Sequence, residues 1–205
     1  ASSLLSEEEE DLFVEDGWVK HRQKRCMVLP IQEVARRTQK TIRGEGHFDP
    51  ETTRLDPETG QGTPYATYAF ATHLAEVEVD IETGKVKVLR VIACHDVGRA
   101  IHPYNVIGQI IGGVPMGVGF ALMEEYDPGR TISFVNYLIP TSKDIPEVIP
   151  ILVEDQEPTG PFGAKGVGEP ALIPSAPAIL NAIADAIGER IYHLPANLER
   201  VLEAV

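Results

Sequence analysis

The chain has 205 residues, 43% of them hydrophobic, and its 31 acidic against 18 basic residues give a formal net charge of -13. This length supports one domain with a packed core, or two small subdomains. The acidic balance, with no basic cluster, argues against nucleic acid and anionic membranes as partners. Cys26 and Cys94 lie far apart without CxxC spacing, which argues against a structural zinc site, a cysteine-ligated cluster or a disulfide scaffold. A reducing, cytoplasmic setting is expected.

The N-terminal residues have neither a basic start nor a sustained apolar stretch, so they do not form a signal peptide, and the missing initiator Met suggests an excised or processed piece. Residues 8–22 predict two short strands around a turn at residues 15–17. Residues 30–42 show helical spacing, and residues 44–64, rich in Gly, Pro, Asp and Thr, predict an irregular connection. We therefore expect an N-terminal part over residues 1–64, with the other elements in residues 65–205.

Residues 74–92 predict an antiparallel hairpin that turns at Thr83-Gly84. The apolar positions expected on its buried face are Leu74, Val77, Val79 and Ile81. The buried valines should supply most of the stabilisation, because facing Glu and Lys residues form only weak, screened pairs.

Residues 106–123 contain no charged residue and approach the length of about 18 residues at which a membrane span is suspected. Five glycines, Pro115 and Gln109 interrupt this run, and Glu124 and Glu125 follow it without a basic flank. We therefore expect a glycine-spaced helix in a folded core and no membrane span.

Small residues recur four apart in this helix, at Gly108 and Gly112 and again at Gly113 and Gly117, which allows close packing. Gln109 lies in an otherwise apolar neighbourhood and needs a partner for its amide. That partner is either backbone within the fold or a bound polar ligand.

The C-terminal part predicts a strand over residues 148–154 and two helices, over residues 175–187 and 197–205. The first helix is expected to be capped by Ser175 and stopped at Gly188. The whole pattern predicts an α+β fold, in which an antiparallel or mixed sheet packs against helices.

Residues 163–170 read Gly-Ala-Lys-Gly-Val-Gly-Glu-Pro, which places Glu169 at the tip of a loop of small residues. Such a loop lets backbone approach a bulky group and aims one base at it. A phosphate-binding loop is disfavoured, because the Gly-Lys-Ser/Thr ending is absent and Glu169 would repel phosphate.

Two other candidate sites are weak. Cys94-His95-Asp96 contains the residue types of a catalytic triad, but neighbours on a strand point to opposite faces. His95 and His102 lack a third ligand at helical or hairpin spacing, so neither is assigned to a metal.

Four motifs follow one another along the chain: Asp96-Val97-Gly98, residues 107–113 (Ile-Gly-Gln-Ile-Ile-Gly-Gly), residues 140–146 (Pro-Thr-Ser-Lys-Asp-Ile-Pro) and residues 163–170. Their order resembles that found in the xanthine dehydrogenase and aldehyde oxidase family of molybdenum hydroxylases. Over nearly its whole length, the chain resembles the C-terminal portion of the large, molybdenum-binding subunit. The resemblance implies that residues 1–205 form a C-terminal molybdopterin-binding domain.

The resemblance also implies a reaction and its site. Molybdopterin, in the cytosine dinucleotide form, would carry molybdenum, and an electron-poor carbon of a purine, N-heterocycle or aldehyde would be hydroxylated with water-derived oxygen. Glu169 would be the general base, and burial would raise its pKa from about 4.3 towards the working pH. Gln109 would contact the cofactor, and Lys165, Gly166, Val167 and Gly168 would line it. For Lys165 a salt bridge that holds the loop is an equal alternative; no residue is implied as a direct metal ligand.

The partners implied are the remainder of the molybdenum subunit and the chains or domains that carry iron-sulfur clusters and FAD. The isolated chain is expected to be inactive, to bind cofactor weakly, and to expose apolar surface that the remainder of the large chain would cover. The alternative is a noncatalytic scaffold or subunit-contact domain of the same fold. Glu169 argues against it, because an acid held in such a loop loses solvation without gaining a partner.

Overall fold

The structure is a computed structural model that describes residues 1–24, 28–38, 41 and 43–205. Its contacts divide the chain into two compact units, Ala1–Asp49 and Pro50–Val205. Cys26 and residues 39, 40 and 42, in the predicted first helix, lie outside the described residues. The assignment of the whole chain to one cofactor-binding domain stays a prediction.

The first unit is a small three-stranded sheet with short helices. In chain order its elements are α1 (Ser2–Leu5), η1 (Glu9–Asp11), β1 (Leu12–Glu15), β2 (Trp18–His21), β3 (Val28–Pro30) and α2 (Ile31–Arg37). β1 and β2 form the predicted hairpin, whose turn places Asp16 and Gly17 at positive φ. β3 adds to β2 in antiparallel fashion. The predicted helix is shorter than expected, because α2 ends at Arg37.

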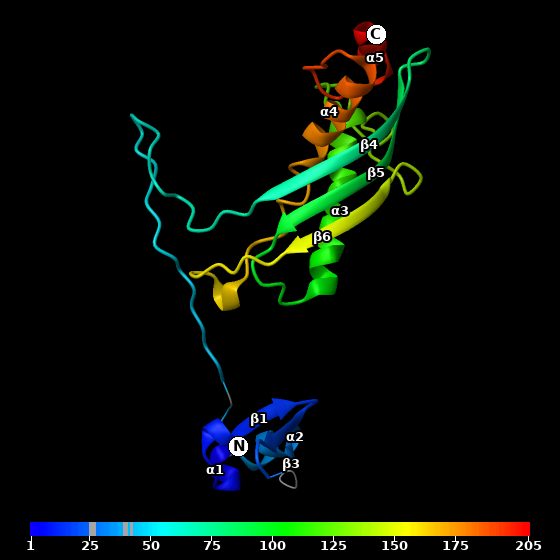
Figure 1. Cartoon of the computed structure of the whole chain (residues 1–205). Coiled ribbons are helices and arrows are strands. Elements are labelled where there is room, and N and C mark those ends of the chain that lie inside the picture. Colours follow the sequence, from blue (N-terminus) through cyan, green and yellow to red (C-terminus); the bar gives the residue numbers. More distant parts are fainter. Residues whose placement is uncertain (25–27, 39–40, 42) are drawn as a thin grey trace. The chain divides into compact units, whose positions relative to one another are not determined.

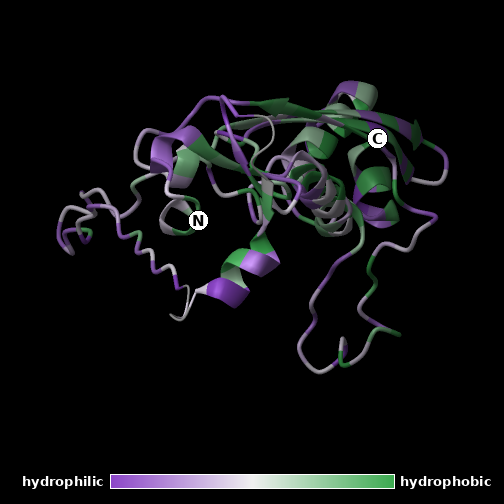
Figure 2. Ribbon diagram, turned by 90° about the horizontal axis from the view of Figure 1, so that it is seen from below, coloured by the Kyte–Doolittle hydropathy of each residue, from purple (hydrophilic) through white to green (hydrophobic). Residues whose placement is uncertain are grey.

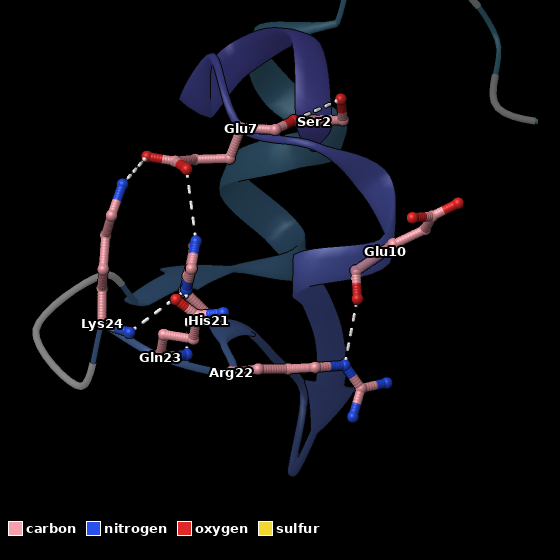
Figure 3. Close-up of polar contacts among 7 residues, drawn as sticks. All are labelled: Ser2, Glu7, Glu10, His21, Arg22, Gln23 and Lys24. Atoms are coloured by element: carbon pink, nitrogen blue, oxygen red, sulfur yellow. Dashed lines mark hydrogen bonds and ion pairs between the residues drawn. The ribbon is translucent and has the colours of Figure 1, made fainter.

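A polar cluster ties the start of this unit to the end of β2 (Figure 3). Nδ1 of the buried His21 accepts hydrogen bonds from the amides of Gln23 and Lys24, which leaves Nε2 as the ring nitrogen that can donate. Nε2 lies 3.2 Å from the Glu7 carboxylate, to which the Lys24 ammonium donates at 2.5 Å. The Lys24 hydrogen bond lowers the pKa of Glu7, which therefore stays ionised.

The second unit contains a mixed sheet with helices. Its elements are β4 (Ala71–Asp80), β5 (Lys85–Asp96), α3 (Pro103–Leu122), β6 (Glu147–Val153), η2 (Pro161–Gly163), α4 (Ser175–Ile187) and α5 (Leu198–Ala204). The strand order is β4-β5-β6, with β5 antiparallel to β4 and parallel to β6 (Figure 1). The predicted α+β class, the hairpin, the late strand and the helices are all confirmed. Residues 44–64, all described, contain no helix or strand, as predicted.

The core of this unit lies between the sheet and the helix pair α3 and α4. Its fully buried members include Val91, Ile110, Val114, Ile179 and Ile183. Hydrophobic residues run along the strands and helices, whereas the connecting segments are largely hydrophilic or neutral (Figure 2). The opposite sheet face carries exposed apolar residues of β6, so the expected exposed apolar surface is present.

The expected buried face of the hairpin is wrong at Leu74, which is 58% exposed. Side chains alternate along β4, so Leu74 shares the outer face with Glu76 and Glu78, while Val77 and Val79 face the core. The register shift after Glu76 leaves an extra residue on β5, so the alternation of β4 is unbroken. Ile81 is also exposed, because it lies in the turn.

The two glycine pairs of α3 have different surroundings. A Cβ on Gly113 would lie 2.6 Å from that of Ala171, and one on Gly117 would overlap Ser175, whereas nothing lies within 4 Å at Gly108 or Gly112. Close packing is therefore confirmed for one pair only. By length and composition α3 could cross a membrane, yet 39% of its most apolar window is buried within this fold, so the composition is weak evidence for a span.

Candidate functional site

The loop of residues 163–170 is fastened to the chain that follows β5. Gly98 and Ala164 form an isolated antiparallel bridge, and the Arg99 amide donates to the Gly163 carbonyl at 2.7 Å. Gly98 has a φ of 60° and lies so close to the loop that a Cβ would overlap the Gly163 carbonyl oxygen. A glycine is required there on both grounds.

A buried ion pair holds the same loop. The Lys165 ammonium donates to Oδ2 of Asp96 at 2.5 Å, and the two side chains are 6% and 9% exposed. The Gly98 amide donates to Oδ1 of Asp96, and the Lys165 amide donates to the Val97 carbonyl. Burial raises the pKa of Asp96, but the bonds from Lys165 and Gly98 outweigh it and hold the pKa below its usual value. The hydrogen bond to Asp96 raises the pKa of Lys165, so both groups stay charged at neutral pH.

Beyond Lys165 the loop presents bare backbone. A Cβ on Gly166 would meet nothing within 4 Å, and one on Gly168 would meet only Nε2 of Gln109, at 3.6 Å. The structure thus brings two of the predicted cofactor contacts together. Gln109 is exposed. Among the described residues its side-chain amide makes no hydrogen bond, so neither a backbone partner nor a ligand is assigned to it.

Glu169 lies at the edge of a cleft of about 870 Å³. One wall is the loop itself, at Gly166, Gly168, Glu169 and Pro170, and the other is the segment before β4, with Tyr65, Tyr68 and Phe70. Those three aromatic side chains are exposed. Glu169 is also exposed, so the described residues do not supply the burial expected of a general base.

The sequence analysis did not predict a second polar cluster, which lies near the end of β5. Nε2 of His95, which is buried, lies 2.7 Å from Nε2 of His73 on β4, and Nδ1 of His73 lies 3.1 Å from Oγ of Ser175. Burial, aided by the charge of His95, lowers the pKa of His73 to about 4, and burial also lowers the pKa of His95. Both rings are neutral at pH 7. The sequence did contain a clue to this cluster: His73 lies at an even spacing from Val77 and Val79, which places all three on the inner face of β4.

The same contacts correct the predicted cap of α4. Ser175 is the first helical residue and caps nothing with its side chain, because its hydroxyl pairs with His73. The predicted stop at Gly188 is confirmed, with φ at 83°.

The structure also bears on the weak candidates. His95 turns to His73 whereas Asp96 turns to Lys165, so residues 94–96 do not assemble as a triad. Within the described part of the chain, no three His, Cys, Asp or Glu residues come together as a metal site.

A comparison with protein families decides the identity of the chain. The model of the molybdopterin cofactor-binding domain matches residues 1–146, well over half of the sequence. The chain belongs to the molybdopterin cofactor-binding domain family. Residues 163–170 lie beyond this match, but relatives that align with nearly the whole chain extend over them.

Two curated relatives of this molybdopterin-binding chain show the breadth of the match. The aldehyde oxidoreductase of Megalodesulfovibrio gigas is 41% identical over 75% of the chain and 17% of its own length. A probable xanthine dehydrogenase component of Bacillus subtilis is 34% identical over 96% of the chain and 26% of its own length. The chain therefore spans about a sixth to a quarter of the length of these two curated relatives.

Solved structures agree with this assignment. Quinoline 2-oxidoreductase from Pseudomonas putida 86 superposes with a TM-score of 0.70 and 30% identity, over the whole chain and 27% of that protein. The expected resemblance to the C-terminal portion of the molybdenum-binding large subunit of molybdenum hydroxylases is confirmed. Relatives of the chain are named as oxidoreductases and dehydrogenases, and among them is a xanthine dehydrogenase molybdenum-binding subunit.

The residues of the loop fit the cofactor that the family name implies. At Gly166 and Gly168 the backbone is open on the cleft side, so a bulky, flat group can lie directly against it. The exposed amide of Gln109 beside Gly168 offers both hydrogen-bond donors and acceptors to such a group. Lys165 differs, because its ammonium is already engaged by Asp96. The salt-bridge alternative for Lys165 is therefore present in the structure.

Proposed function

We propose that this chain supplies the general base and one wall of the cofactor cleft of a molybdenum hydroxylase. The observation that carries the proposal is the position of Glu169, at the edge of a cleft whose near wall is bare glycine backbone. Gly166 and Gly168, which precede the carboxylate, leave room for cofactor and substrate together. The Lys165–Asp96 pair fixes the start of the loop, so the backbone that leads to Glu169 begins at a fixed position.

Five residues are proposed to hold the cofactor: Gln109 through its amide, and Lys165, Gly166, Val167 and Gly168 through backbone. Bound molybdopterin supplies the redox chemistry by which an electron-poor carbon gains an oxygen from water. Glu169 accepts a proton in that reaction and must return it to solvent, for which its exposed position provides a path. The remaining walls, which exclude water from the reacting centre, are assigned to the remainder of the subunit.

The proposed substrates are purines, N-heterocycles or aldehydes. The names of relatives support these classes, since they include a quinoline oxidoreductase and an aldehyde oxidoreductase. The proposed pterin is the cytosine dinucleotide form, and iron-sulfur and flavin groups on partner chains or domains are proposed to remove the electrons. The isolated chain is proposed to be inactive, because it spans about a quarter or less of the relatives' length.

The test is the variant Glu169→Gln in the complete molybdenum subunit, assembled with its partner chains. Turnover is expected to fall by about 10²- to 10⁴-fold, the range lost with a general base, while molybdenum content is unchanged. Glu82→Gln is the matched control, because Glu82 is exposed in the turn at the opposite end of the β4–β5 hairpin. It should leave turnover at the wild-type level.

Near-normal turnover of Glu169→Gln at equal molybdenum content would refute the proposal. That result would favour the alternative of a noncatalytic scaffold or subunit-contact domain with the same fold.

A further inference from the structure

The segment that carries Glu169 is fastened to the fold at both ends by two neighbouring residues at the end of β5. His95 and Asp96 are adjacent and both buried, and successive strand residues point to opposite faces. Asp96 binds Lys165, which is four positions before Glu169. His95 contacts His73, which in turn contacts Ser175, six positions after Glu169.

The first anchor is ionic. Asp96 binds the Lys165 ammonium at 2.5 Å, and the backbone bridge between Gly98 and Ala164 runs beside it. Because both side chains are buried, removal of the ammonium would leave an uncompensated charge on Asp96. The loop is thus held at residue 165 by a buried ion pair.

The second anchor is a chain of neutral groups. It runs from His95 through His73 to the hydroxyl of Ser175, the fully buried first residue of α4. A neutral imidazole donates from one nitrogen and accepts at the other, so His73 can bond to both neighbours at once. Ser175 is also confined from the opposite side, because Gly117 of α3 packs directly on it.

Between these anchors the backbone makes only local hydrogen bonds among the described residues. For residues 166–174 the recorded bonds are from the Leu172 amide to the Glu169 carbonyl, from Ser175 to Leu172 and from Ala178 to Pro174. Two residues of the middle pack on the core: Ala171, which is fully buried against Gly113, and the partly buried Val167. The direction of the Glu169 carboxylate, which lies between them, therefore depends on this packing and on where the two ends are held.

We propose that Asp96 with Lys165, and His95 with His73 and Ser175, are positioning residues that set the direction of the Glu169 carboxylate. The proposal rests on the proposed function of Glu169 as the base. None of these side chains needs to touch the substrate. They act through the placement of residues 166–174.

The test compares Lys165→Met and Ser175→Ala in the complete molybdenum subunit with its partner chains, at matched molybdenum content. A displacement of about 1 Å can lower a rate by about 10²-fold, so kcat of Lys165→Met is expected to fall by about 10- to 100-fold. Ser175→Ala, which removes one neutral hydrogen bond, should lower kcat by about 3- to 10-fold. KM should change less than about twofold, because substrate binding is not the step affected.

Two further variants separate positioning from general damage. Lys165→Arg keeps a cation beside Asp96 and should recover a large part of the lost kcat. Lys87→Met, the same substitution on the same strand as Asp96, is the matched control, because Lys87 is exposed and pairs in register with Glu78. It should retain the wild-type kcat.

Hydrogen exchange of the Leu172 and Ser175 amides, which donate to the Glu169 and Leu172 carbonyls, gives a readout that does not depend on turnover. Exchange should be faster in Lys165→Met and Ser175→Ala than in Lys87→Met. Unchanged exchange together with kcat within twofold of the control would overturn the proposal, and so would equal losses in Lys165→Met and Lys165→Arg. If Glu169→Gln itself retained turnover, the proposed function would fail, and the exchange rates would still decide whether the anchors hold the segment.

Discussion

The neighbouring glycines of α3 allow the packing beside the Glu169 segment to be measured. Gly113 is buried, and a Cβ placed on it would lie 2.6 Å from the Ala171 Cβ and 2.8 Å from the Ala171 carbonyl carbon. Gly112 precedes it in the same helix, is exposed, and has open space where its Cβ would lie. Substitution of each by alanine therefore adds the same methyl group in two opposite environments.

The expected magnitudes follow from two opposing effects. Alanine is favoured over glycine within a helix by about 0.8–1.0 kcal/mol at either position. At Gly113 the contact is with backbone atoms, which cannot rotate away, so overpacking should cost about 1–3 kcal/mol. Because the helical gain cancels between the variants, Gly113→Ala should be less stable than Gly112→Ala by about 1–3 kcal/mol. This difference corresponds to about 2–12 °C in Tm for a chain of this length.

The assay is thermal unfolding of the 205-residue chain, followed by circular dichroism at 222 nm and checked by urea unfolding. Gly112→Ala should melt at or above the wild-type temperature, and Gly113→Ala should melt below Gly112→Ala. Equal melting temperatures, or a lower one for Gly112→Ala, would show that α3 does not press on Ala171. The support that Ala171 gives to the segment carrying Glu169 would then be absent.

Two further predictions concern the end of β5. Gly98→Ala should lower Tm more than Gly129→Ala. Both positions have positive φ, but of the two only Gly98 faces backbone atoms of the loop, where a Cβ would lie 2.8 Å from the Lys165 nitrogen. Equal losses of Tm would mean that the backbone strain of a positive φ, and not the contact with the loop, sets the cost. Stability should fall as the pH drops from about 6.5 to about 4, because unfolded His73 takes up a proton over that range while folded His73, with its pKa near 4, does not. Thermal unfolding at pH 7 and 4.5 should show a smaller loss for His73→Gln than for the wild type, and an equal loss would contradict the assignment.

The elements with strong local periodicity were predictable from the sequence, and their long-range contacts were not. The β4–β5 hairpin, α3 and α4 follow from alternation, helical spacing and a stop at Gly188. The error at Leu74 arose because an even position was grouped with odd ones in a strand whose period is two. The error at Ser175 has a different cause. A hydroxyl at a helix start usually caps the helix, but here His73, 102 positions away in the chain, takes it.

At the candidate site, too, the sequence predicted which residues matter but not which of them contact one another. Lys165 and Asp96 each stood in a recognised motif, yet they are 69 positions apart, so their pairing needed the fold. Gln109 and Gly168 were both expected at the cofactor, and only the structure shows that the two lie side by side.

The glycines of α3 show in physical terms why spacing alone was insufficient. The pairs Gly108 and Gly112, and Gly113 and Gly117, have the same separation of four, so the sequence predicts equal packing for both. Adjacent helical residues are rotated by about 100°, however, so the two pairs occupy different faces of one helix. Only the face with Gly113 and Gly117 meets Ala171 and Ser175. Gly108 and Gly112 leave bare backbone next to Gln109. The helix therefore packs against the Glu169 segment through the face with Gly113 and Gly117, while the face with Gly108 and Gly112 stays open beside the proposed cofactor contact.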